Sequence, residues 1–168
     1  IVAGDIGCYT LAAMKPISGM DMQICMGASI GMGLGLRKVL PEEKARKVVS
    51  VIGDSTFMHS GLTGLLEMVY NPPPTGHIVV VVDNSTTAMT GQQENPGTGR
   101  KLDHTPTNAV SIERVAEAIG IQNVRVFNPV REGAQIKEFI AEKMKTNELT
   151  LVVLRQTCIL AAAQLAKR

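Results

Sequence analysis

This chain has little net charge and few aromatic side chains. The formal net charge at pH 7 is +2, tryptophan is absent, and aromatic residues make up 3% of the composition. A nucleic-acid-binding surface gathers basic side chains on one face, and a surface for single strands adds aromatic rings on which bases stack. Because the basic residues here are scattered and lack interleaved aromatics, the sequence predicts no nucleic-acid partner.

Long hydrophobic runs and a signal peptide are missing too. No apolar run approaches the roughly 20 residues that a helix needs to cross a bilayer, and the first residues have none of the features of a secretory leader. The three cysteines are an odd number at wide spacing, so they form neither a disulfide framework nor a metal-binding pair within this chain. We therefore expect a soluble, cytoplasmic protein with no membrane partner.

The bulk composition suits one folded unit. With 168 residues, of which 45% are hydrophobic, the chain is long enough to bury one core, and no shift in composition divides it. We expect a single domain over residues 1–168. The opening residues, IVAGDIGC, look like the end of a strand that runs straight into a glycine loop. We therefore also expect this domain to be a fragment of a longer subunit.

Two short apolar runs in the first half of the chain each end in a polar cluster. Val48–Ile52 leads into Gly53-Asp54-Ser55, and Ile78–Val82 leads into Asp83-Asn84-Ser85. Runs of Val and Ile without regular polar alternation are typical of strands buried on both faces of a parallel sheet. With the helix-like segment Ser60–Asn71 between them, the two runs predict a strand–helix–strand crossover.

Asp54 and Asn84 should meet at one edge of this sheet. The carboxyl ends of parallel strands lie together, and ligands bind there because the loops, unlike the buried strands, are free to carry polar groups. A carboxylate and an amide oxygen are hard donors that suit a magnesium ion holding a diphosphate. The alternative is that both side chains only cap their own loops.

The rest of the chain alternates between strand-like and helix-like segments. Strands are predicted over Ile1–Ala3, Asn123–Phe127 and Leu149–Leu154, and helices over Gly27–Leu40, Ile112–Ile119, Arg131–Lys145 and Ile159–Arg168. Ser111 and Gly120 are candidate caps of the second of these helices. The alternation predicts an α/β fold, a doubly wound, mostly parallel sheet with helices on both faces.

Two segments of the chain require a special reason. The predicted helix Gly27–Leu40 contains Gly31, Gly33 and Gly35, and each glycine inside a helix costs roughly 0.5–1 kcal/mol relative to alanine. Either a backbone or cofactor approaches closely there, or the helix packs tightly on the sheet. Residues 86–108 form a long polar segment, which is uncommon unless it is functional or mobile. We expect it to be mobile when no cofactor is bound.

Four stretches resemble one family of thiamine-diphosphate enzymes. They are GDIGCYTL at 4–11, CMGASIGMG at 25–33, GDSTFMHSG at 53–61 and DNSTTAMTGQQ at 83–93. Together they are similar to the thiamine-diphosphate-binding domain of the indolepyruvate:ferredoxin oxidoreductase alpha subunit, within the wider 2-oxoacid:ferredoxin oxidoreductases. The resemblance covers nearly the whole chain.

The resemblance implies a clamp of magnesium and thiamine diphosphate. Asp54 and the side chain of Asn84 match two magnesium ligands of the family, and the backbone carbonyl of Thr86 matches a third. Backbone amides of the next segment are placed to donate to phosphate oxygens. The matching residues of that phosphate loop are Gly53, Ser55 and Thr56, with serine where the wider superfamily has a third glycine.

Further cofactor contacts follow from the same resemblance. Met26 matches the bulky residue that holds the cofactor in its bent shape, and the carbonyl of Ile24 matches the acceptor for the pyrimidine amine, with Gly27 next to them. Thr90 begins the segment Thr90–Gln93, which resembles the family's closing loop, and Met89, directly before it, is also predicted to bind the cofactor. These five residues complete the predicted cofactor-binding set.

The three histidines are expected to differ in role. His59 lies one turn past the phosphate loop and is the candidate catalytic residue, placed to act on a substrate carboxylate or carbonyl. The alternative is that His59 only orders that loop. His77 and His104 are predicted to be surface groups.

The resemblance also gives the cysteines a context. In related oxidoreductases a four-iron cluster is held by a C-P-G-C pair, a cysteine in a Gly-Cys loop and a cysteine after the last strand. Cys8 and Cys158 match the last two positions, and the C-P-G-C pair is absent from this sequence. Two cysteines cannot hold such a cluster. An iron–sulfur cluster is therefore expected only in an intact protein, the alternative being two ordinary thiols, and Cys25 is predicted to pack internally.

The implied reaction is oxidative decarboxylation of a 2-oxo acid, an arylpyruvate such as indolepyruvate, to an acyl-coenzyme A with electrons passing to ferredoxin. The glutamate that activates the cofactor would come from a partner pyrimidine-binding domain, so we expect a second subunit, an oligomer, and no turnover by this chain alone. The rivals are a non-oxidative 2-oxoacid decarboxylase and a non-catalytic interface module.

Overall fold

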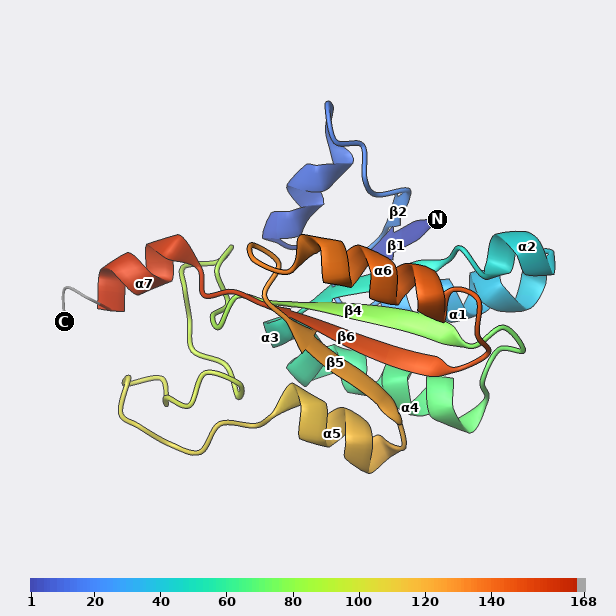
Figure 1. Ribbon diagram of the computed structural model, residues 1–168. Coiled ribbons are helices and arrows are strands. Elements are labelled where there is room, and N and C mark those ends of the chain that lie inside the picture. The colour runs from blue at the N-terminus through green and yellow to red at the C-terminus, as the bar shows by residue number, and fades with distance from the viewer. Residues whose placement is uncertain (166–168) are drawn as a thin grey trace.

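The computed structural model describes residues 1–165 and contains one six-stranded sheet in which every pairing is parallel. The strand order is β2-β1-β3-β4-β6-β5 (Figure 1). The strands are β1 (Val2–Gly4), β2 (Met22–Gln23), β3 (Val49–Gly53), β4 (His77–Asp83), β5 (Asn123–Phe127) and β6 (Leu149–Arg155). From β1 the chain adds β2 on one side and β3, β4, β6 and β5 on the other, which confirms the predicted doubly wound α/β fold.

Helices cover both faces of the sheet. They are η1, a 3₁₀ segment (Cys8–Ala13), α1 (Ser29–Val39), α2 (Glu42–Ala45), α3 (Asp54–Thr56), η2, a π-helical turn (Phe57–Gly61), α4 (Leu62–Tyr70), α5 (Ile112–Ile119), α6 (Gly133–Lys143) and α7 (Ile159–Leu165). Helices α1, α4 and α5 contribute to one apolar cluster and α6 packs against the other, so α6 lies on the opposite face from the first three (Figure 1).

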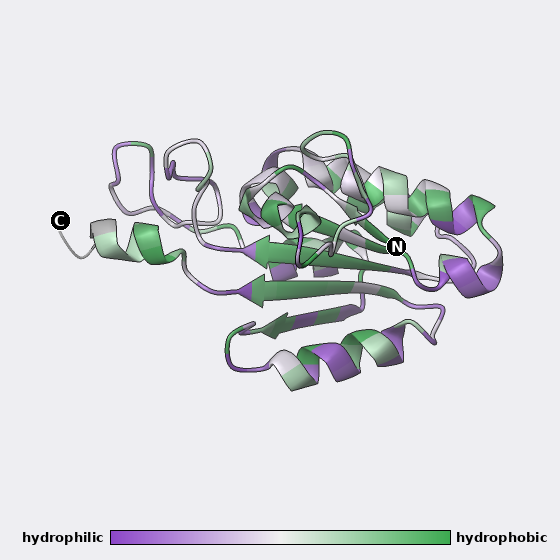
Figure 2. Cartoon of the chain, turned by 90° about the horizontal axis from the view of Figure 1, so that it is seen from above, coloured by the Kyte–Doolittle hydropathy of each residue, from purple (hydrophilic) through white to green (hydrophobic). Residues whose placement is uncertain are grey.

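The strands are hydrophobic along their length because both of their faces are buried. In β4, Val79 and Val81 belong to the cluster shared with α1, α4 and α5, whereas Ile78 and Val80 belong to the cluster covered by α6. Figure 2 shows the central strands as hydrophobic along most of their length, with polar residues at their ends and in the loops beyond them. This is why the sequence shows continuous Val and Ile runs here and no alternation.

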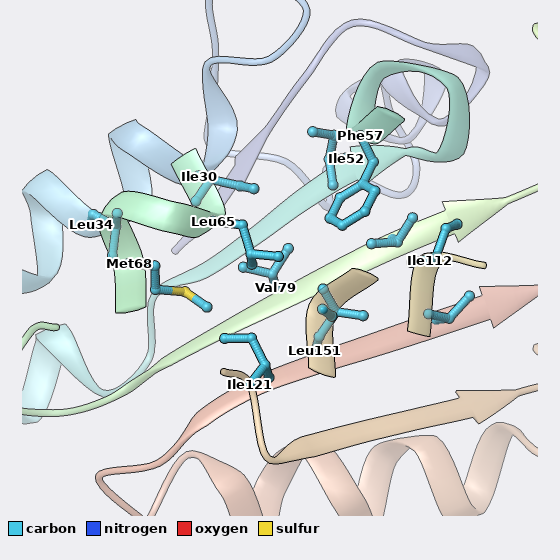
Figure 3. Packing of buried hydrophobic residues seen from close by; sticks show 13 residues of the cluster. Ile30, Leu34, Ile52, Phe57, Leu65, Met68, Val79, Ile112, Ile121 and Leu151 are labelled. Atoms are coloured by element: carbon cyan, nitrogen blue, oxygen red, sulfur yellow. The ribbon is translucent and has the colours of Figure 1, made fainter. Parts of the chain in front are cut away.

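The larger cluster fixes how the crossover helices sit on the sheet. Ile30 and Leu34 of α1 and Leu65 and Met68 of α4 converge on the strand residues that face them (Figure 3). Phe57, fully buried, packs in the same cluster directly after Asp54–Thr56. The turn that carries Asp54 is therefore anchored to the core by Phe57, three residues further along the chain.

Most predicted elements are confirmed, with shifted boundaries. Ser111 accepts the amide N–H of Arg114 at 3.2 Å, and Gly120 ends the helix in the left-handed region with φ 115°. The crossover turns helical at Asp54, earlier than the predicted Ser60. The short β2 and α2 were not predicted, because neither is long enough to show a period. Of the predicted closing helix, residues 166–168 lie outside the described part of the chain.

Two predictions about burial were wrong. His77 is fully buried, with its Nε2 atom 2.8 Å from Ser50 Oγ. Cys25 is exposed and does not pack internally. A histidine that starts a strand in the middle of a parallel sheet is covered by the helices of the sheet, whereas Cys25 follows β2 at the sheet edge.

The glycines of α1 have two different surroundings. A Cβ on Gly33 would lie 2.2 Å from Ser50 Oγ and 2.7 Å from His77 Cε1, so tight helix–sheet packing requires glycine there. Added Cβ atoms on Gly31 and Gly35 would meet nothing within 4 Å. Close packing therefore explains one of the three glycines.

In the described residues no helix is both long and apolar enough to cross a membrane.

Candidate functional site

The ends of β3 and β4 bring the two polar clusters together. The strands pair in register, with Val51 opposite Val80 and Gly53 opposite Val82, so the loops that follow start side by side. A cavity of about 100 Å³ lies there. Its lining includes ten of the predicted site residues: Cys8, Met26, Gly53, Asp54, Ser55, Thr56, Asn84, Thr86, Met89 and Thr90.

Asp54 is a buried carboxylate without a basic partner. Its residue is 6% exposed, and burial, followed by the charge of nearby Asp83, raises its pKa to about 6. The amide nitrogen Nδ2 of Asn95 donates to Asp54 Oδ2 at 3.2 Å. In the described part of the chain no lysine, arginine or histidine forms an ion pair with Asp54. A buried carboxylate in this state is costly unless a cation offsets it.

Asn84 and Thr86 form the second side of the cavity. The Thr86 amide donates to Asn84 Oδ1 at 3.2 Å, and the backbone carbonyl of Asn84 accepts the amide of Cys158 at 3.0 Å. Thr86 is buried, and its hydroxyl donates to the Gln93 carbonyl at 3.2 Å. Asn84 thus does order its own loop, as the capping alternative expected, while its amide oxygen keeps a further lone pair for a ligand.

The donors in this cavity fit a magnesium ion. A carboxylate, a side-chain amide oxygen and a main-chain carbonyl are the hard oxygen ligands that magnesium uses, with water and phosphate oxygens filling the remaining positions. Within residues 1–165 there is no group of three or more His, Cys, Asp and Glu side chains that could hold a metal. A magnesium ion bound here would therefore need further oxygen ligands, such as water or phosphate oxygens.

The segment predicted to bind the diphosphate begins the crossover helix. Asp54–Thr56 form α3, Gly53 precedes it in extended conformation, and the helical path continues through η2 into α4. The amides of Ser55 and Thr56 lie in the first turn, where helix N–H groups have no intrahelical acceptor. His59 lies in η2, is exposed, and does not line the cavity.

The turn before α1 forms another wall of the cavity. Met26 lines it while remaining 43% exposed, whereas Ile24 is 70% exposed and lies outside it. Gly27 has φ +92°, and its amide donates to Asp5 Oδ2 at 2.8 Å. The amide of Ser29 donates to Asp5 Oδ1 at 2.6 Å. Asp5, itself fully buried, therefore holds the turn that presents Met26.

The cysteines lie on different sides of the site. Cys8 is exposed and lines the cavity, whereas Cys158 follows β6 and reaches the site only through its backbone bond to Asn84. Cys8, Cys25 and Cys158 are all free thiols. The iron–sulfur role predicted for Cys8 and Cys158 stays a prediction.

Four residues of the site were missed by sequence reasoning. Asp5 follows the first strand in the same Gly-Asp pattern as Asp54, and that repeat was a usable signal. Tyr9 lines the cavity with its hydroxyl buried and without a hydrogen-bond partner in the described residues, and burial raises its pKa. Asn95 and Thr87 bond to Asp54 and Ser55 respectively, the latter at 2.8 Å. Neither belongs to a pattern that would have shown this.

The long segment after β4 carries its own hydrogen bonds. Thr87 and Gln93 exchange two backbone bonds of 2.9 and 3.2 Å, which closes residues 87–93 into a small hairpin over the cavity. The Glu94 carboxylate then accepts from Arg100 Nε at 2.8 Å and pairs with His104 Nδ1 at 2.9 Å. These contacts hold the pKa of Glu94 down, to about 2. Whether the segment moves without cofactor stays a prediction.

An all-parallel sheet with an oxygen-donor cavity where β3 and β4 end is the architecture of a cofactor-binding α/β domain. Residues 5–154 match the family described as the C-terminal TPP-binding domain of thiamine pyrophosphate enzymes, and the chain belongs to this family. The family is the one expected from the four sequence stretches.

Named relatives agree with this assignment. Indolepyruvate oxidoreductase subunit IorA of Archaeoglobus fulgidus is 38% identical over 98% of this chain and 25% of that subunit. The IorA subunit of Thermococcus kodakarensis is 41% identical over 95% of this chain and 26% of that subunit. The chain thus spans about a quarter of the length of these relatives.

A solved structure shares the fold. It is 2-oxoglutarate:ferredoxin oxidoreductase from Magnetococcus marinus with 2-oxoglutarate, coenzyme A and succinyl-CoA bound. The TM-score is 0.73 at 17% identity, over 94% of this chain and 54% of that chain. The two chains therefore share the arrangement of strands and helices.

Proposed function

We propose that this chain is the magnesium- and thiamine-diphosphate-binding domain of a 2-oxoacid:ferredoxin oxidoreductase. The observation that carries the proposal is the buried Asp54 carboxylate, which has no cation partner in the described residues and lines one cavity with Asn84 and Thr86. Membership of the thiamine pyrophosphate enzyme family supports it. The domain is proposed to span residues 1–168 within a longer subunit.

Each wall of the cavity has a proposed task. Asp54, the side chain of Asn84 and the carbonyl of Thr86 hold magnesium, and the amides of Ser55 and Thr56 bind the diphosphate. Thiamine diphosphate, when bound, supplies the carbon nucleophile and the electron sink for decarboxylation. The chain itself contributes the binding and the orientation of the metal and the cofactor.

The apolar side of the cavity orients the organic part of the cofactor. Met26 and Met89 line it from opposite loops, and Gly27 reaches its positive φ in the turn that presents Met26. Thr90, in the 87–93 hairpin, closes the cavity toward solvent, and the carbonyl of Ile24 is proposed to accept the pyrimidine amine. His59 is exposed, so a catalytic role for it requires substrate to enter from outside the cavity.

The substrate class follows from the relatives. The curated relatives are named indolepyruvate oxidoreductases, and the solved neighbour binds 2-oxoglutarate and coenzyme A. We propose that the whole protein oxidises an arylpyruvate such as indolepyruvate to an acyl-coenzyme A and passes the electrons to ferredoxin. Cys8 and Cys158 are proposed iron–sulfur ligands in that protein. A cytoplasmic location is also proposed.

A partner pyrimidine-binding domain is proposed to complete the site. Among the described residues that line the cavity there is no glutamate, so the activating carboxylate must come from elsewhere. Residues 8–26 expose large apolar side chains, and Cys8, Tyr9 and Met26 of this segment line the cavity. The exposed apolar side chains are Leu11, Met14, Ile17, Met22, Ile24 and Met26. An apolar surface of this kind marks an interface, and we propose that the partner domain of an oligomer covers it.

The test uses the full-length protein with all its subunits. Calorimetry should show binding of Mg²⁺ and thiamine diphosphate together, and reduction of ferredoxin or a viologen should require both 2-oxo acid and coenzyme A. Asp54→Ala should abolish binding and reduction, whereas Glu138→Ala, at an exposed carboxylate of α6, should leave both intact. Unchanged binding by Asp54→Ala would reject the proposal. Decarboxylation without coenzyme A or an electron acceptor would favour a non-oxidative enzyme.

A further inference from the structure

The amide of Asn95 is fixed at both of its ends. Asn95 is buried, its Oδ1 accepts the N–H of Gly97 at 2.9 Å, and its Nδ2 donates to Asp54 Oδ2 at 3.2 Å. Because the oxygen end is taken by a backbone N–H, the nitrogen end must face the carboxylate, and the reversed amide would place two acceptors together. One oxygen of Asp54 is thus held by an amide donor and the other is left for a ligand.

Asn95 is also the first residue of a loop that closes on itself. The amide of Val110 donates to the Pro96 carbonyl at 2.8 Å, and the amide of Thr107 donates to the Gly99 carbonyl at 2.9 Å. The 95–110 loop is therefore one unit with its own bonds. Asn95 is the residue that joins this unit to Asp54.

A second cavity, of about 350 Å³, lies on the side of Asp54 where the 95–110 loop passes. Asp54 and Asn95 both line it, together with Gly97 and Val110 of the loop. Asp54 therefore borders open space on two sides, the cofactor cavity and this one. Without the bond from Asn95, the carboxylate would be free to turn into the larger space and away from the metal position.

We propose that Asn95 is a positioning residue that aims the Asp54 carboxylate at the metal and couples cofactor binding to the order of the 95–110 loop. This inference rests on the proposed function, because it requires Asp54 to ligate magnesium. Residues that orient metal ligands typically change metal affinity about 10–100-fold when they are removed. By linkage, a metal that fixes Asp54 also stabilises the loop that Asn95 ties to it.

The experiment measures metal affinity and hydrogen exchange on the full-length protein. Mg²⁺ is titrated calorimetrically at saturating thiamine diphosphate, and deuterium uptake is followed for peptides within 95–110 with and without both ligands. In the wild type, binding should slow exchange in the loop. Asn95→Ala should weaken Mg²⁺ binding about 10-fold or more and remove most of that protection. Asn108→Ala, the same change at an exposed residue of the same loop, should behave as wild type.

The outcomes separate this inference from the function on which it rests. Wild-type protein that binds no Mg²⁺ with thiamine diphosphate would overturn the proposed function and this inference with it. If the wild type binds and Asn95→Ala binds with equal affinity, only the inference fails. Should Asn95→Ala not fold, as judged by circular dichroism without metal, the wild-type exchange data decide: unchanged uptake in 95–110 on binding rejects the coupling.

Discussion

Two buried charged groups lie at opposite ends of β3 and β4, and they are treated in opposite ways. At the amino ends, Arg37 is 3% exposed and its guanidinium donates to the carbonyls of Val48, Thr75 and Gly76 at 2.8 Å, among other acceptors. At the carboxyl ends, Asp54 is 6% exposed and has the Asn95 amide as its side-chain partner.

The difference shows how to tell a structural charge from one that awaits a ligand. The donors of Arg37 are used by carbonyls that would otherwise be buried without partners, so the cation belongs to the folded chain itself. Burial shifts the pKa of both groups, lowering that of Arg37 to about 10 and raising that of Asp54 to about 6, but Asp54 has far fewer hydrogen-bond partners. A group left in this state is characteristic of a functional site.

The largest expected effect is on stability at the amino end. Arg37→Met should lower the free energy of unfolding by about 3–5 kcal/mol, because it leaves several buried carbonyls without donors. Chemical denaturation of the cofactor-free protein measures this. Lys38→Met, at the exposed neighbour on α1, is the control and should change stability by less than about 0.5 kcal/mol. A small effect of Arg37→Met would mean that water replaces the guanidinium.

At the carboxyl ends of β3 and β4, removing the buried charge should change the free energy of unfolding in the opposite direction. Asp54→Asn should raise the cofactor-free stability by about 1–3 kcal/mol near pH 8, because it removes a desolvated charge, and it should abolish magnesium binding. Denaturation without metal and calorimetry with it give the two numbers on one variant. A loss of cofactor-free stability would show that the carboxylate is already compensated and would weaken the comparison.

The next effect concerns pH and the fully buried His77. Burial, followed by the charge of Arg37, lowers its pKa to about 3. Ser50 Oγ donates to the Ser29 carbonyl at 2.7 Å and so accepts from His77 Nε2, while Nδ1 has no partner in the described residues. A proton added at Nδ1 therefore has no acceptor.

Since the pKa of His77 is lower folded than unfolded, its contribution to stability is present above the unfolded pKa of roughly 6.5 and is lost as pH falls. Between about pH 6 and pH 4 this residue should cost roughly 1 kcal/mol per pH unit. His77→Gln should flatten that slope, measured by urea unfolding across the range. His59→Gln, at an exposed histidine that forms no ion pair in the described residues, is the matched control. An unchanged slope in His77→Gln would place the pH dependence elsewhere.

The smallest expected effects concern how closely α1 packs on the sheet next to Ser50 and His77. Gly31→Ala should stabilise the protein by about 0.5–1 kcal/mol, because the position is helical and open. Gly33→Ala should destabilise it by about 1–3 kcal/mol, since the new Cβ meets Ser50 and His77. Thermal unfolding of both variants decides. Equal effects of the two substitutions would show that α1 can shift away from the sheet.

The α/β fold, the crossover from Val48 to Val82 and the family could all be predicted from the sequence alone. Val and Ile runs indicate strands buried on both faces. The motifs after those strands are short continuous stretches, so they can be recognised in a single sequence. Asp54 and Asn84 could be paired because parallel strands end at the same edge of a sheet, a rule that requires no side-chain detail.

Which polar groups are buried, and which partners they have, became clear from the tertiary structure. The burial of His77, the requirement for glycine at position 33, and the bond from Asn95 to Asp54 all join residues that are distant in the chain. No hydrophobic period or motif predicts these contacts, because burial and hydrogen bonding depend on which distant residues the fold brings next to each other. The partners of Asp54 and Arg37, and therefore the contrast between the two ends of the strands, are properties of the folded chain.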